Sequence, residues 1–202
     1  MKPMTLWFYH PTVLPEGKPA VPDFVPPLQR RRFSPLQSRF FTVAHAVNEG
    51  LPSRYKTVFA SEDGEDALTR RIVKEFNECG EVSPARFSTS VYNAAPGIYS
   101  IFDHCHEAYT AIAAGPETPE VGWLEALTER GARLWVYAEE TNGGCGMGVR
   151  IEAAPLKDTD SWKVVVSDGV PGAPSLTRAD MAAFLRGETA TLVSRSFTLT
   201  RR

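Results

Sequence analysis

The chain has 202 residues, of which 43% are hydrophobic and 23% charged, and its formal net charge is -2. This apolar content is enough for a packed core, and one domain spanning residues 1–202 is the expected organisation. A charge so close to zero lacks the basic footprint of nucleic-acid-binding proteins, so we expect neither nucleic acid nor an anionic membrane surface as the main partner.

Targeting signals and cysteine usage point to one compartment. No run of eighteen apolar residues is present, and the first residues lack the apolar core of a secretory signal. The three cysteines, Cys79, Cys105 and Cys145, form no CxxC pair, which is typical of reduced thiols. We therefore expect a soluble cytoplasmic protein with no membrane-spanning segment.

The first two thirds of the sequence predict alternating strands and helices. Residues 5–9 are rich in aromatic and β-branched types, as in a strand, and the prolines between 15 and 27 predict an extended connector. Ser34 and Pro35 mark the start of a helix that reaches about Asn48. Further elements are expected as a strand at 56–61, a helix ended by Gly80, a helix capped by Asn93 or Ser90, a strand at 109–114, a helix at 118–131 and a strand at 134–138.

Each of the later helices carries an apolar stripe that we expect to be buried. The stripes are Leu68, Ile72, Val73 and Phe76, then Ile98, Ile101 and Phe102, and finally Val121, Leu124 and Leu127. Alternating strands and helices predict an α/β fold, with a mixed, mainly parallel sheet flanked by helices.

The last third changes character. It predicts strands at 148–153 and 162–167, a short helix at 177–186 and a final strand at 191–199. We expect these elements to cap the preceding part of the fold.

Several short motifs have two interpretations. The glycine-rich segment 143–148, GGCGMG, is compatible with a nucleotide-binding loop, but the residues after it predict a strand, which favours a hairpin turn. The arginine run 30–32 either contacts phosphate or forms a solvated approach to a helix, and the second role is the commoner one. Tyr92, Trp123 and Trp135 are expected in the core or an interface.

His104, Cys105 and His106 are the densest group of potential metal ligands. Adjacent residues rarely point at one ion, and no second group lies at a zinc-site spacing, so we predict no metal and no cofactor. Cys105 or Cys145, with a histidine brought near by the fold, would support a thioesterase or acyltransferase. Nothing in the local sequence favours that alternative.

Four separated segments resemble the N-terminal domain of β-ketoacyl synthases, in the form that accompanies aryl polyene and related type II fatty acid or polyketide systems. They are RRRFSPL, VFASEDG, SPARFSTSVYNAAPGIYSI and TAIAAGPET, and the resemblance covers residues 5–139. It implies a thiolase-like half fold in which the strand at 109–114 lies at a dimer interface and pairs with its counterpart in a second subunit. Chain length factors are the best-known non-catalytic members of this superfamily.

The resemblance also implies what is missing. In an active condensing enzyme the turn after this strand carries the acyl-accepting cysteine, and here Ala114 takes that position. Alanine forms no thioester. The two histidines and the lysine of ketosynthases belong to a second half-domain outside the matched region. We therefore expect a non-catalytic chain length factor that pairs with an active β-ketoacyl synthase and helps to wall the pocket for an acyl chain carried by acyl carrier protein.

An apolar strand of small residues at a sheet edge invites aggregation unless a partner covers it, and we expect a large apolar interface there. A homodimeric scaffold without acyl chemistry is the third possibility. The residues predicted at the interface or acyl pocket are Asn93, Ala94, Ala95, Pro96, Gly97, Tyr109, Thr110, Ala111, Ile112, Ala113 and Ala114.

Overall fold

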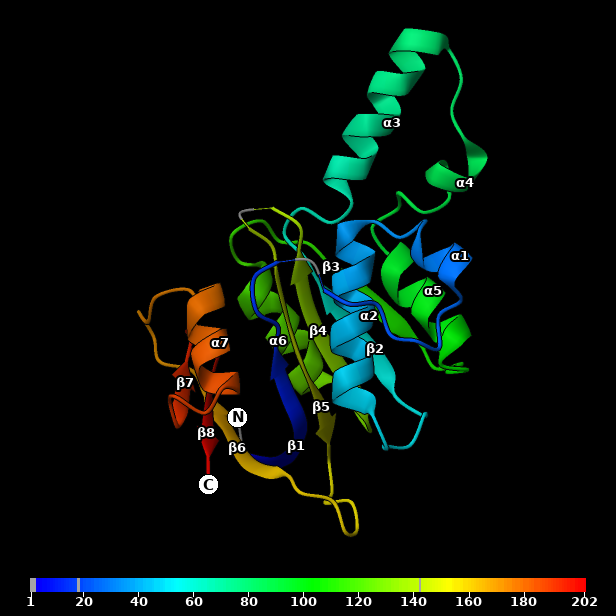
Figure 1. The fold of residues 1–202 in the computed structure, drawn as a ribbon. Coiled ribbons are helices and arrows are strands. Elements are labelled where there is room, and N and C mark those ends of the chain that lie inside the picture. Colours follow the sequence, from blue (N-terminus) through cyan, green and yellow to red (C-terminus); the bar gives the residue numbers. More distant parts are fainter. Residues whose placement is uncertain (1–2, 18, 142) are drawn as a thin grey trace.

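One eight-stranded sheet runs through the computed structural model, which describes residues 3–17, 19–141 and 143–202 (Figure 1). The strand order is β3-β2-β4-β5-β1-β6-β8-β7. The strands are β1 (Met4–Val13), β2 (Lys56–Ala60), β3 (Tyr109–Ile112), β4 (Arg133–Glu139), β5 (Cys145–Glu152), β6 (Trp162–Asp168), β7 (Thr191–Val193) and β8 (Phe197–Arg201). The helices are α1 (Pro27–Arg30), α2 (Pro35–Asn48), α3 (Asp66–Cys79), α4 (Pro84–Phe87), α5 (Ala94–Phe102), α6 (Thr118–Thr128) and α7 (Arg178–Leu185).

The sheet is mixed, as expected, but its parallel part is small. β2 pairs in parallel with β3 and β4, whereas the other pairings among the described strands are antiparallel. Parallel neighbours need a crossover such as a helix, and α6 supplies one between β3 and β4. β4 instead turns directly into β5 as a hairpin. The α/β class and the flanking helices are therefore confirmed, and the expectation of mainly parallel strands is corrected.

Helices cover both faces of the sheet and create two cores. α2 and α5 lie on one face, where Phe40, Phe41 and Tyr99 pack. α6 and α7 lie on the other face, where Trp123, Trp135 and Phe184 are buried (Figure 1). The strands between them are apolar on both sides, as in β4, which is buried along its whole length.

The start of α2 follows the predicted chemistry. The Ser34 side chain accepts a hydrogen bond from the Gln37 N–H at 3.0 Å, and the Gln37 side chain accepts from the Ser34 N–H at 3.3 Å. This reciprocal cap satisfies two backbone donors that the first turn leaves free. In the preceding arginine run, Arg30 donates to Asp23 at 2.9 Å and to the Val25 carbonyl oxygen, so its role here is local and structural.

The buried faces predicted for α3, α5 and α6 are partly wrong. On α3 only Ile72 is buried, while Val73 and Phe76 are half exposed. On α5 Ile101 is exposed and Tyr99 is buried in its place, and on α6 Trp123 is buried whereas Leu124 is 38% exposed. A helical stripe shows which side is apolar, but the packing of neighbouring elements decides which residues are covered. Figure 1 shows that α3 and α4 stand clear of the sheet.

The last third extends the sheet through β5, β6, β8 and β7. The predicted hairpin is present, with Glu139 opposite Cys145 across β4 and β5. The glycine-rich segment is not all turn, because its residues from Cys145 onward already belong to β5, which begins earlier than expected. The expected last strand is two strands, because the Ser194 side chain accepts from the backbone N–H groups of Ser196 and Phe197 and bends the chain there. No helix in the described ranges is both long enough and apolar enough to cross a lipid bilayer.

Candidate functional site

The carboxyl ends of β2, β3 and β4 meet at one edge of the fold. In α/β sheets this is where ligand and catalytic groups gather. Tyr92, just before α5, reaches into this place: its hydroxyl accepts from the Ser61 N–H at 3.0 Å and lies 2.5 Å from the Ile112 carbonyl oxygen. Because Ser61 follows β2 and Ile112 ends β3, one tyrosine holds the two strand ends together.

Glu139, the last residue of β4, completes this junction. Its buried carboxylate accepts from the Ser61 hydroxyl at 3.0 Å and from the backbone N–H of Glu62. Burial raises the pKa of Glu139, although these hydrogen bonds oppose the rise. The role of Glu139 is thus to anchor the loop after β2, and this contact joins residues far apart in the chain.

Ala114 lies in the turn that leads from β3 to α6. Its N–H donates to the Thr118 hydroxyl at 2.8 Å, and that hydroxyl donates to the Gly115 carbonyl oxygen at 2.7 Å. Gly115 has φ +55°, a conformation that glycine adopts without strain. The order of strand, tight turn and helix is as expected, but the strand ends at Ile112, so Ala114 lies in the turn, where its side chain is a methyl group.

The strand before this turn lies at the edge of the sheet, and among the described residues it pairs only with β2. Tyr109 is 39% exposed, Ala113 is exposed, and Thr110, Ala111, Ile112 and Ala114 are half-buried. Small side chains therefore line an accessible backbone edge.

The predicted interface residues on the α5 side divide into two groups. Asn93 is exposed, and a Cβ placed on Gly97 would lie 3.1 Å from the Tyr109 hydroxyl oxygen, so α5 and β3 approach closely there. Ala94, Ala95 and Pro96 are instead buried within the chain. The accessible part of the predicted surface thus consists of Asn93, Gly97 and β3 with its turn.

The cysteines lack the features of activated nucleophiles. Cys105 is buried, and its Sγ donates to the Tyr55 carbonyl oxygen at 3.2 Å. Burial raises the pKa of Cys145, and the neighbouring Arg178 offsets this only in part. His104 and His106 are exposed beside Cys105. In the part of the chain that the structure describes, no three His, Cys, Asp or Glu side chains are placed to hold a metal ion.

A buried acidic group near this edge, Glu65, was not predicted. Glu65 is 3% exposed and accepts from the Ser34 hydroxyl and from the Gln37 side-chain amide, both at 2.8 Å. Burial raises its pKa to about 7, and the nearby Glu140 acts in the same direction. In the sequence Glu65 is one of several acidic residues before α3. Its contact with Ser34 could not be predicted, because the two residues lie 31 positions apart in the chain.

The C-terminal strands also reach the Ala114 turn. Arg195 pairs with Glu117 at 2.9 Å, and the Ser196 hydroxyl donates to Glu120 at 2.8 Å. Both acceptors lie at or near the start of α6. The turn between β7 and β8 therefore holds the beginning of α6 in place.

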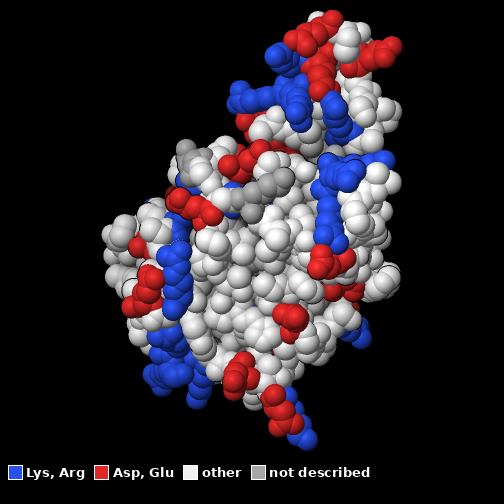
Figure 2. Space-filling model, viewed as in Figure 1, with Lys and Arg blue, Asp and Glu red and all other residues white. Residues whose placement is uncertain are grey.

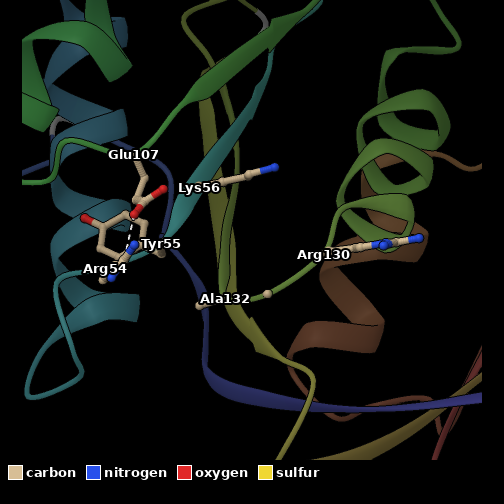
Figure 3. Close-up of a pocket in the computed structure, with 7 residues that line it drawn as sticks. Arg54, Tyr55, Lys56, Glu107, Arg130 and Ala132 are labelled. Atoms are coloured by element: carbon tan, nitrogen blue, oxygen red, sulfur yellow. Dashed lines mark hydrogen bonds and ion pairs between the residues drawn. The ribbon is translucent and has the colours of Figure 1, made fainter.

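A surface hollow of about 250 Å³ lies at the opposite end of the parallel strands (Figure 3). Arg54 and Glu107 meet there at 2.7 Å, while Lys56 and Arg130 point away from them. Lys56 pairs with Glu129 at 2.6 Å. Three of the charged residues that line the hollow, Arg54, Lys56 and Glu107, are already in ion pairs. The hollow also lies at the amino ends of the strands, so we do not consider it the functional site.

Gly64 offers a test of the junction. It has φ +56°, and an added Cβ would lie 2.4 Å from Cδ2 of Tyr92. Gly64→Ala is expected to lower the free energy of unfolding by about 2–3 kcal/mol, from backbone strain and displacement of Tyr92. Gly80→Ala is the matched control, because Gly80 has φ +72° with nothing within 4 Å, and it should lose only about 1 kcal/mol. Equal losses in urea denaturation would show that Tyr92 is not held there.

Three comparisons with known proteins bear on this site. A model of the β-ketoacyl synthase N-terminal domain matches residues 5–139. No curated protein matches. Among solved structures, the chain is similar to one chain of the complex between the ketosynthase ApeO and its chain length factor ApeC from Xenorhabdus doucetiae. The TM-score is 0.67 and the identity is 19%, over 90% of this chain and 83% of the matched chain. At this identity the likeness shows the fold, and it confirms the expected thiolase-like ketosynthase architecture.

Proposed function

Because the chain belongs to the family of β-ketoacyl synthase N-terminal domains, we propose that it is a non-catalytic subunit that forms a heterodimer with an active β-ketoacyl synthase. The observation that carries this proposal is Ala114, whose methyl group stands in the turn between β3 and α6. The resemblance implies that active members of the family carry the acyl-accepting cysteine at the position that Ala114 takes in this turn. A methyl group accepts no acyl chain.

The proposed task is that of a chain length factor. The subunit would complete the fold of its partner and wall the pocket that holds the acyl chain, which acyl carrier protein delivers to the complex in aryl polyene or related polyketide or fatty acid elongation. The similar solved structure is a ketosynthase in complex with its chain length factor, which supports this choice of partner.

The edge strand β3 is the proposed pairing surface. It exposes Tyr109 and the small residues of its turn, and on its free side no described strand satisfies the backbone. Pairing with a second subunit would satisfy these groups and remove an aggregation-prone edge. Cysteine chemistry receives no comparable support, because Cys105 is buried and the pKa of Cys145 is raised.

The direct test is coexpression of the tagged chain with each β-ketoacyl synthase of the source organism that carries an active-site cysteine. We expect one synthase to copurify in equal amount and to make products of different length with and without the subunit. Unchanged product length together with unchanged synthase solubility would contradict the proposed function.

Restoring the nucleophile alone is expected to have no effect. Ala114→Cys in the isolated chain should show condensing activity no higher than the wild-type chain, because none of the described histidines lies in the turn or on α6. His104 and His106 precede β3, at the end of the strand opposite to Ala114, and His10 and His45 lie on β1 and α2. The assay is condensation of radiolabelled malonyl and acyl thioesters, with an active synthase as the positive control. Turnover by the variant would show that this chain holds more of the machinery than we propose.

A further inference from the structure

A second surface hollow, of about 390 Å³, lies where the pairing of β1 with β6 stops. β6 starts at Trp162, which pairs with Phe8, whereas β1 continues along β5 as far as Val13. After Phe8, β1 therefore has no described strand on the β6 side, and this step in the sheet leaves the hollow. The residues that line it are Phe8, His10, Pro11, Asp160, Ser161 and Trp162.

The backbone on both sides of this hollow is strained. His10 has φ +47° in a β-bulge between Tyr9 and Thr12, and Asp158, in the loop before β6, has φ +53°. They are two of the three non-glycine residues with positive φ in the part of the chain that the structure describes. Such conformations persist only where the surrounding structure enforces them, and they gather at binding and active sites. The strain therefore marks this hollow as a candidate ligand site.

Three polar side chains that line the hollow are free to contact a ligand. The side chains of His10, Asp160 and Ser161 make no hydrogen bond or ion pair with any other residue that the structure describes. A ligand pocket typically combines apolar walls with a few polar groups that fix the orientation of the ligand. Here these groups are an imidazole, a carboxylate and a hydroxyl.

The aromatic walls are fixed by contacts within the chain. Phe184 of α7 packs edge-on against both Phe8 and Trp162, at 6.5 Å between ring centroids in each case. The Arg201 guanidinium lies 4.6 Å from the centre of the Trp162 ring and donates to the Gly187 carbonyl oxygen at 3.0 Å. A flat ring and a positive charge are thus held side by side.

Basic residues gather on this side of the molecule, although the net charge of the chain is -2. α7 begins with Arg178 and is followed by Arg186, and β8 ends with Arg201 next to Arg202. Figure 2 shows Lys and Arg side chains at the left of the view, over α7 and the C-terminal strands. Such a surface attracts ligands that carry negative charge.

A nucleoside monophosphate matches all the groups that the hollow offers. Its base is a flat ring, which aromatic side chains such as Trp162 bind by stacking. Its phosphate accepts hydrogen bonds from a guanidinium and an imidazole, which Arg201 and His10 supply. The two hydroxyl groups of its ribose donate to a carboxylate, as they do to the acidic residue of dinucleotide-binding folds, and Asp160 is such a group. An inorganic anion would leave Asp160 and Trp162 unused.

We propose that this hollow binds a nucleoside monophosphate whose ribose hydroxyls are free. The base stacks on Trp162, the phosphate lies toward Arg201 and His10, and the ribose hydroxyls donate to Asp160. Coenzyme A and the internal nucleotides of RNA are excluded, because each carries on its ribose a phosphate that Asp160 repels. β5, β4 and β2 separate β1 from β3 in the sheet, so this site does not depend on the proposed heterodimer.

Isothermal titration calorimetry of the purified wild-type chain tests the proposal with AMP as the probe. We expect one site per chain with a dissociation constant below about 1 mM. Adenosine, inorganic phosphate, 2′,3′-dideoxy-AMP and coenzyme A should each bind at least about tenfold more weakly, because each lacks one of the contacts or meets repulsion. No binding of AMP, or binding of inorganic phosphate as tight as that of AMP, would overturn the proposal.

Two variants assign the contacts. Asp160→Ala should weaken AMP binding by about tenfold and leave 2′,3′-dideoxy-AMP unchanged, because only AMP has the hydroxyl pair. Arg201→Gln should weaken AMP binding by about tenfold and leave adenosine unchanged, because adenosine has no phosphate. Lys157→Ala, in the same loop as Asp160 and with a side chain 92% exposed, is the control and should bind AMP within about twofold of wild type.

Circular dichroism shows whether each variant is folded. Asp160 is exposed in a loop, so Asp160→Ala should melt like the wild type and decides the question even if Arg201→Gln does not fold. If Asp160→Ala binds AMP as the wild type does, or weakens AMP and 2′,3′-dideoxy-AMP equally, the ribose is not held at Asp160 and the proposal is wrong.

Discussion

Replacing Trp123 with alanine is expected to lower the free energy of unfolding by about 3–5 kcal/mol, the largest loss that we predict for any single residue. Trp123 of α6 is fully buried, and its ring stacks on Trp135 at 4.3 Å and on Phe8 at 5.7 Å between centroids. These three rings join α6 to β4 and β1. Removing the Trp123 ring would leave a cavity, and the surrounding side chains belong to a sheet and can move little to fill it. Urea denaturation followed by circular dichroism measures the loss.

The neighbouring residue provides the control. Leu124 is 38% exposed on the outer side of the same helix, so Leu124→Ala should cost less than about 1 kcal/mol. The sequence predicts both Leu124, from its apolar stripe, and Trp123 in the core, and the structure buries only Trp123 of the two. A loss for Leu124→Ala as large as that for Trp123→Ala would mean that α6 is rotated relative to the structure.

Local signals predicted the fold best. The start of α2 at Ser34 and Pro35 depends on a cap formed within four residues, and the end of α3 at Gly80 depends on one glycine with φ +72°. The hairpin between β4 and β5 follows from a glycine-rich turn in the same way. Where the residues that determine an element's start, end or turn lie within a few positions of it, the sequence is sufficient to predict that feature.

The parts of the fold that the sequence did not predict depend on packing between residues far apart in the chain. The apolar stripe of α3 predicts a buried face, but no stripe shows that α3 projects from the body with Phe76 half exposed. The place of β1 between β5 and β6 depends on pairing with strands far along the chain. Such pairings are determined by the whole assembly of apolar surfaces rather than by the residues of one strand.

In the candidate site, too, the features that depend on nearby residues were predictable and those that depend on distant contacts were not. The turn at Ala114 was predictable, because a strand, a small-residue turn and a capped helix follow each other in the sequence. The contacts that shape its surroundings were not, since Glu139 meets the Ser61 hydroxyl across 78 positions of the chain. Buried carboxylates such as Glu139 and Glu65 appear in the sequence as ordinary acidic residues of a turn.

The difference in stability between Glu65→Gln and the wild type is expected to depend on pH. Burial raises the pKa of Glu65 from 4.5 to about 7 in the folded chain. Between these values the folded state holds a proton that the unfolded state has released, so this group's contribution to stability is full below pH 4.5 and is lost as the pH rises to about 7. Each unit of pKa corresponds to about 1.4 kcal/mol, which makes the loss on the order of 3 kcal/mol.

Glutamine in this position mimics the neutral carboxyl group. It keeps an oxygen that accepts from Ser34 and Gln37 and carries no charge at any pH. The variant should therefore match the wild type in urea denaturation at pH 5 and exceed it by about 2–3 kcal/mol at pH 8. Glu78→Gln on the exposed side of α3 is the control and should follow the wild type within about 0.5 kcal/mol at both values. A constant difference between Glu65→Gln and the wild type across this range would mean that Glu65 is already ionised when the chain folds, and that its contact with α2 is a charged one.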